Sequence, residues 1–155
     1  MLSDDMKRVI TEQRLGFVAT VNPDGSPNLS PKGTFIVVSD TSIAFAEIRS
    51  PGTLRNLRSN PAIEVNFIDP FVRKGYRFAG RATIVARGES GFEQELTRFQ
   101  QFDLMPAMRA IVTIAVSSAH PLTSPAYDGG QTEADLRRSW TKRFRLLQPG
   151  QRFEE

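Results

Sequence analysis

The chain of 155 residues contains no cysteine, and only one histidine and one tryptophan. The lack of cysteine excludes disulfides, thiolate metal sites and a cysteine nucleophile, and it suits a reducing compartment. No apolar run approaches the roughly 20 residues that span a bilayer. Asp4 and Asp5 stand where a secretory signal would be basic, and no apolar segment of the signal-peptide kind follows them. We therefore expect a cytoplasmic protein that does not enter a membrane.

The composition is typical of one folded domain. Hydrophobic residues make up 39% of the sequence and charged residues 24%, which separates it from disordered chains. A length of 155 residues fits one domain with a sizeable core. We expect a single domain over residues 1–155, with its core at about 8–118 and a C-terminal tail and helix at about 119–147.

Short runs of β-branched and aromatic residues between turn-forming residues predict six strands. The alternation is clearest at 62–68, where Ile63, Val65 and Phe67 would face inward. The sequence NPDG at 22–25 predicts a tight turn after the first strand, because proline fixes φ and glycine tolerates positive φ. The predicted strands cover residues 16–21, 28–39, 42–48, 62–68, 76–87 and 110–118.

Short helices are predicted between and beyond these strands. Ser3 begins one helix, Ser90 caps another that reaches about residue 102, and Thr132 and Asp135 have the spacing of a capping box. Because most strands are joined as hairpins, the pattern favours a mainly β (α+β) fold, a six-stranded antiparallel barrel with peripheral helices.

The segment RSPGTLRNLRSNP at 49–61 predicts a helix whose start could hold an anion. Ser50 and Pro51 form an N-cap followed by proline at the first helical position, and the free backbone N–H groups there favour negative charge. Six arginines and Lys74 lie between Arg49 and Arg81, against two acidic residues. An ordinary capped helix with solvated arginines is the alternative interpretation.

The segment SPKGT at 30–34 interrupts the second predicted strand. Pro31 and Gly33 are poor strand formers on either side of Lys32. Glycine within a strand often marks the close approach of a ligand to the backbone, so this segment is a candidate ligand contact, although a simple bulge would give the same pattern.

Other candidate residues give weaker signals. His120 precedes proline without nearby carboxylates, which favours a structural role, and no cluster has metal-ligand spacing. Trp140 lies on one helical face with Leu136 and Phe144, which favours core or dimer packing over contact with a cofactor. The aromatic residues do not interleave with arginines as in an RNA-binding sheet, so we expect no nucleic-acid partner.

The ordered set of segments in residues 8–118 resembles the pyridoxamine 5′-phosphate oxidase-like, FMN-binding split-barrel family. The features that carry this resemblance are a first strand ending in a D-G turn, a second strand with a polar break, and a third strand feeding a short helix with Thr53 and Asn56 that ends in Asn60-Pro61. A later strand carries the sequence AGRA at 79–82.

The resemblance implies a six-stranded antiparallel split barrel that forms a homodimer, with FMN in a groove between the two protomers. By position, the flavin ring and ribityl chain would contact Ser30, Pro31, Lys32, Gly33 and Thr34. The ribityl phosphate would be surrounded by Ala46, Glu47, Arg49, Ser50 and Thr53.

This sequence departs from the oxidases in two places. Their two basic phosphate-binding residues align with Gly52 and Thr53, so Arg49 or Arg55 would have to substitute for them. Near the C-terminus the oxidases carry an arginine–histidine pair that grips the substrate, whereas RRSWTKRFRLLQ at 137–148 has no histidine. We therefore expect an FMN-dependent oxidoreductase other than pyridoxamine phosphate oxidase.

Several alternatives remain open at the level of sequence. The protein could be a non-catalytic flavin-binding electron carrier or a sensor, and the groove could take a deazaflavin or haem in place of FMN. A small-molecule substrate or NAD(P)H would be the partner of an enzyme. The catalytic residues and the substrate are not indicated by any motif.

Overall fold

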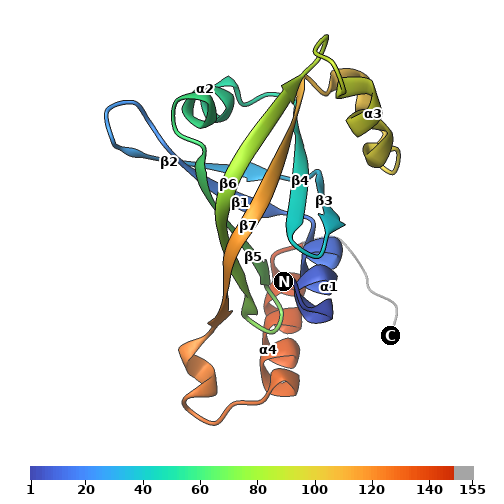
Figure 1. Ribbon diagram of the computed structural model, residues 1–155. Helices are drawn as coiled ribbons and strands as arrows, with labels where there is room; N and C mark the ends of the chain where they lie inside the picture. The colour runs from blue at the N-terminus through green and yellow to red at the C-terminus, as the bar shows by residue number, and fades with distance from the viewer. Residues whose placement is uncertain (149–155) are drawn as a thin grey trace.

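The computed structural model describes residues 1–148 as one curved antiparallel sheet with helices along its edges and ends (Figure 1). The strands are β1 (Gly16–Val21), β2 (Pro27–Lys32), β3 (Phe35–Ser39), β4 (Ser42–Glu47), β5 (Ala62–Asp69), β6 (Lys74–Ala86) and β7 (Ala110–Thr123). The helices are α1 (Asp4–Gln13), α2 (Pro51–Ser59), α3 (Phe92–Leu96) and α4 (Glu133–Leu146), with 3-10 turns at Thr97–Phe99, Met105–Ala107 and Pro125–Tyr127.

The strand order β2-β1-β5-β6-β7-β4-β3 places β2 and β3 at opposite edges of the sheet. Only Gly33 and Thr34 separate these two strands along the chain. A two-residue link cannot cross a flat sheet of this width, so the sheet must curve until its edges approach each other. The mainly β, antiparallel split-barrel fold predicted from the sequence is confirmed.

The described part of the chain has seven strands, so the prediction of six was wrong. Residues 28–39 form two strands, because the polar break at Gly33 and Thr34 carries the chain from one sheet edge to the other. The last strand also continues to Thr123, although residues 119–123 read as an irregular tail, because it pairs with β6 across His120 and Pro121. These two residues lie near the end of the ladder, where proline is tolerated.

Two apolar clusters hold the sheet and helices together. One fills the barrel, where Phe35 contacts Phe45 and Phe67 with ring centroids 5.2 and 4.8 Å apart, and where α1 and α2 contribute buried residues. The other lies between β4 and the segment that contains α3. Both clusters use side chains that alternate along β4, and burial on both faces of this strand explains why its four central residues, IAFA, are all apolar.

The helices begin at local signals that were mostly visible in the sequence. Ser3 accepts a hydrogen bond from the Met6 N–H, and Thr132 forms a capping box with Asp135. The exception is α3, whose N-cap is Gly91 in a left-handed conformation, so the prediction that Ser90 caps this helix was wrong. Arg87 instead anchors the segment by donating to the Met105 and Met108 carbonyls.

The fourth helix packs against the turn between β5 and β6. The Arg73 guanidinium lies 3.3 Å from the centroid of the Trp140 ring, and Phe71 stacks edge-on against Phe144 with centroids 5.2 Å apart. Trp140 therefore has an intramolecular packing role, as the sequence favoured. Within the described residues, no helix has both the length and the apolar character needed to cross a bilayer.

Gly80 provides a test of this fold. It lies at a register shift between β6 and β7, and a Cβ on it would lie 2.2 Å from the carbonyl oxygen of Ala115. Gly80→Ala should lower the free energy of unfolding by about 2 kcal/mol, because the two strands would have to separate. Chemical denaturation measures the change.

Gly33→Ala is the matched control for that substitution. A Cβ on Gly33 meets no atom within 4 Å, and its backbone does not have a positive φ. This variant should unfold within about 0.5 kcal/mol of the wild type. Equal losses in the two variants would show that close strand packing at Gly80 is not the cause.

Candidate functional site

The start of α2 lies beside the end of β2, and the two together form a polar cluster. Ser50 is the N-cap residue of α2, as predicted, and Pro51 follows it in the first turn. The Ser50 side chain does not cap its own helix. Its hydroxyl lies 3.4 Å from the Ser30 hydroxyl, which joins two segments that are 20 residues apart in the sequence.

Lys32 extends this cluster from the last residue of β2. Its Nζ donates a hydrogen bond of 2.7 Å to the Ser30 hydroxyl, and only 7% of the residue is exposed. Burial lowers the pKa of the Lys32 ammonium, and the negative charge of Glu47 opposes that shift. A positive charge is thus held in a poorly solvated position next to the start of a helix.

Glu47 contributes an acidic group from the end of β4. It is 2% exposed, and its carboxylate accepts a hydrogen bond from the Ser50 backbone N–H. Its own backbone carbonyl accepts from the Arg109 N–H, which fixes the residue beside β7. The N-terminus of α2 therefore already has an internal anionic acceptor.

Ser30, Lys32, Glu47 and Ser50 together form the polar corner of the sheet, and Thr34 holds this corner in place. Its buried hydroxyl donates to the Ala46 carbonyl at 2.8 Å and accepts from the Ala46 N–H at 3.1 Å. A side chain thus makes the two hydrogen bonds that a neighbouring strand would normally provide. The contact fixes the position of Lys32 relative to Glu47.

A polar seam continues along α2 towards the turn after β1. Ser50, Thr53 and Asn56 follow one another at three-residue spacing, and the Asn56 amide donates to the Thr20 hydroxyl at 3.1 Å and to the Asn22 side chain at 2.9 Å. Thr20 and Asn22 were missed as site residues, because in the sequence they resemble an ordinary strand end and turn.

Two polar atoms of this seam are buried without a partner. Thr53 is 1% exposed, and neither its hydroxyl oxygen nor the side-chain carbonyl oxygen of Asn56 has a hydrogen-bond partner among the described residues. Buried polar groups are normally satisfied, so unpaired atoms in the first two turns of α2 indicate a place where a polar ligand or water completes the structure.

The structure does not bring every predicted residue into the cluster. Pro31 is exposed and lies on the opposite face of β2 from Ser30 and Lys32, and Gly33 is exposed at the strand break. Arg49 and Arg55 are also exposed. A guanidinium nitrogen of Arg55 lies 3.7 Å from where a Cβ on Gly52 would be, so this side chain folds back towards the start of the helix.

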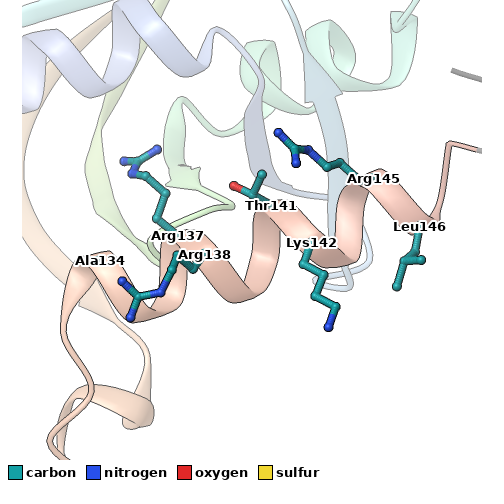
Figure 2. A pocket seen from close by; sticks show the side chains of 7 residues that line it. All are labelled: Ala134, Arg137, Arg138, Thr141, Lys142, Arg145 and Leu146. Carbon is teal, nitrogen blue, oxygen red and sulfur yellow. The ribbon is translucent and has the colours of Figure 1, made fainter. Parts of the chain in front are cut away.

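A second basic region lies on α4, where a hollow of about 730 Å³ follows one side of the helix (Figure 2). Its lining residues within the described chain all belong to this one helix, and two of its arginines already form ion pairs, Arg137 with Asp69 and Arg138 with Asp135. Its described lining has no aromatic side chain, and the side chains of one helix do not by themselves enclose a flat ligand.

No group of three or more metal-ligating side chains occurs in the described part of the chain. The sole histidine, His120, is exposed on β7 and lies opposite Arg77 of β6 in the strand register. The chemistry available at the polar corner is that of an ammonium, a carboxylate, hydroxyls and backbone N–H groups, which suits hydrogen bonding to a polar ligand.

These features define a split barrel with a polar corner at the start of its second helix. The profile of the pyridoxamine 5′-phosphate oxidase family matches residues 2–122. The chain therefore belongs to this family, as its sequence indicated. No curated protein sequence matches it.

Solved structures agree with this assignment. HupZ of Group A Streptococcus is 32% identical, with a TM-score of 0.70 over 80% of this chain and 96% of the HupZ chain. An FMN-binding protein from Syntrophomonas wolfei is 12% identical, with a TM-score of 0.66 over 79% of this chain and 87% of that chain. A protein named F420 reductase is 22% identical, with a TM-score of 0.60 over 76% and 98% of the two chains. The last two likenesses show the fold alone.

Thr34→Val tests the anchoring of this corner. Valine keeps the shape of the side chain but removes both hydrogen bonds to Ala46, so two buried backbone groups lose a partner. The free energy of unfolding should fall by about 2 kcal/mol. Thr41→Val is the control, because Thr41 is exposed, and it should change stability by less than about 0.5 kcal/mol. A wild-type stability for Thr34→Val would contradict the anchoring role.

Proposed function

We propose that this chain is an FMN-binding flavoprotein of the oxidoreductase type. The observation that supports this most directly is the polar corner between β2 and α2, where Ser30, Lys32 and Ser50 are joined by hydrogen bonds next to an unpaired buried hydroxyl of Thr53. Family membership supports the same proposal, because relatives with this fold include proteins named for FMN binding.

The residues present fit the phosphate end of FMN. The unpaired Thr53 hydroxyl can donate to a phosphate oxygen, and the Ser50 hydroxyl lies beside it at the start of the same helix. Arg49 and Arg55 flank this point, and neither has an ion-pair partner within residues 1–148. They supply the positive charge that Gly52 and Thr53 lack at the positions where the oxidases are basic.

The end of β2 would hold the ring of the same cofactor. Lys32 lies next to the strand break at Gly33 and provides a positive charge, while the bare backbone at Gly33 leaves room for a flat group. Bound FMN supplies the electron-transfer chemistry, and the protein positions the cofactor and sets the charge around it. Either NAD(P)H or a small molecule would serve as the electron donor.

We also propose that the protein is a homodimer with the cofactor at the protomer interface. The outer face of the β1–β2 hairpin is apolar, with Phe17 42% exposed and Leu29 66% exposed. In the strand register Phe17 lies opposite Pro31, and Leu29 lies opposite Ala19, so these side chains form one continuous strip. An exposed apolar strip of this kind on an edge hairpin suits a second copy of the chain packed against it.

Arg49→Ala tests the phosphate assignment. Loss of this guanidinium at the positive end of α2 should weaken FMN binding about tenfold, because a charge-assisted hydrogen bond to the phosphate would be lost. Titration with FMN, followed by flavin fluorescence, measures the dissociation constant.

Arg58→Ala is the matched control, since Arg58 lies in the last turn of α2, near the negative end of the helix. This variant should bind FMN within about twofold of the wild type. Equal effects of the two substitutions would mean that the arginines act only as a diffuse basic surface.

Leu29→Glu tests the dimer. The wild type should elute with the mass of two chains in size-exclusion chromatography with light scattering. A buried glutamate would oppose association, so the variant should elute as a monomer and bind FMN more weakly. Leu104→Glu, at another exposed leucine, should leave the dimer intact. A dimer that tolerates Leu29→Glu would place the interface elsewhere.

A further inference from the structure

Glu47 occupies the place at the start of α2 where an anionic ligand would be expected. Its carboxylate accepts the Ser50 backbone N–H, which is the first free donor at the N-terminus of this nine-residue helix. It is 2% exposed, so solvent screens its charge poorly. The role argued for Glu47 rests on the FMN function proposed above.

The negative charge of Glu47 is only partly balanced within the cluster. Lys32 is its cationic neighbour, but the Lys32 ammonium donates to the Ser30 hydroxyl, and no ion pair within 4.0 Å joins the two residues in the described part of the chain. Arg49 and Arg55 are exposed to solvent. Any phosphate that approaches the helix start therefore meets a fixed, buried negative charge.

The hydrogen bond itself does not require this charge. A neutral amide oxygen accepts a backbone N–H equally well in geometry, and serine, threonine or asparagine side chains commonly cap helices without any charge. A buried carboxylate is more costly than these alternatives, and unlike them it places a negative charge beside the start of α2. The unpaired Thr53 hydroxyl in the same turn is a separate sign that a polar ligand enters here.

We propose that Glu47 is a specificity-determining residue of the flavin site, which lowers the affinity for the phosphate of FMN relative to flavins without a phosphate. A phosphomonoester carries a charge of about −1.5 to −2 at neutral pH, whereas the ribityl end of riboflavin is uncharged. The carboxylate repels the first and leaves the second unaffected. With Glu47 present, the preference of the site for FMN over riboflavin is smaller than the arginines alone would give.

Glu47→Gln separates the charge from the hydrogen bond. Glutamine keeps an acceptor for the Ser50 N–H and a similar volume, so the corner should remain folded. Wild type and variant are titrated with FMN and with riboflavin at the same ionic strength, and isothermal titration calorimetry gives both dissociation constants. We expect Kd for FMN to fall about tenfold and Kd for riboflavin to change less than twofold.

Glu93→Gln controls for the change in net charge, because Glu93 is exposed on α3, outside the proposed site. It should alter neither constant. An unchanged or larger Kd for FMN in Glu47→Gln, or equal changes for both flavins, overturns the role assigned to Glu47 while flavin binding itself stands. If neither protein binds either flavin, the proposed cofactor is wrong and the role of Glu47 falls with it.

Discussion

The structure depends on the two-residue passage between β2 and β3. Because these strands lie at opposite edges of the same sheet, residues 33 and 34 require the sheet to curve until its edges meet. Thr34 makes this geometry stable by hydrogen bonding both backbone groups of Ala46. The same contact places the end of β2 beside the end of β4. The contact that closes the barrel therefore also brings the residues of the polar corner together.

Closure also explains why polar groups are buried at this corner. Lys32 and Glu47 are the last residues of the strands that meet here, and Ser50 at the start of α2 donates its backbone N–H to Glu47 and lies 3.4 Å from the Ser30 hydroxyl. Most of the resulting hydrogen bonds are internal, including those from Asn56 to Thr20 and Asn22. The unpaired Thr53 hydroxyl is an exception, and it lies where the helix start favours an anion. The residues of the proposed cofactor site are thus brought together when the barrel closes.

Much of this fold could be predicted from local patterns. The helix starts at Ser3, Ser50 and Thr132 were visible because N-cap positions depend on near neighbours in sequence. The division of residues 28–39 into two edge strands was not, since apolar alternation does not reveal which edge a strand joins. The sequence marked Ser50 through the predicted helix start, and Ser30 and Lys32 through the strand break at Pro31 and Gly33, but only the family resemblance placed them around one ligand. Thr20 and Asn22 were missed because their partner, Asn56, lies more than 30 residues away.

The proposed function depends on whether the corner formed by β2 and α2 binds FMN. The most direct measurement is a titration of FMN into the purified wild-type protein, followed by the visible absorption and fluorescence of the flavin. We expect a saturable spectral change with one FMN per chain, because the ring would be enclosed and the phosphate anchored. A flavin spectrum that remains that of free FMN at saturating protein concentration would contradict it.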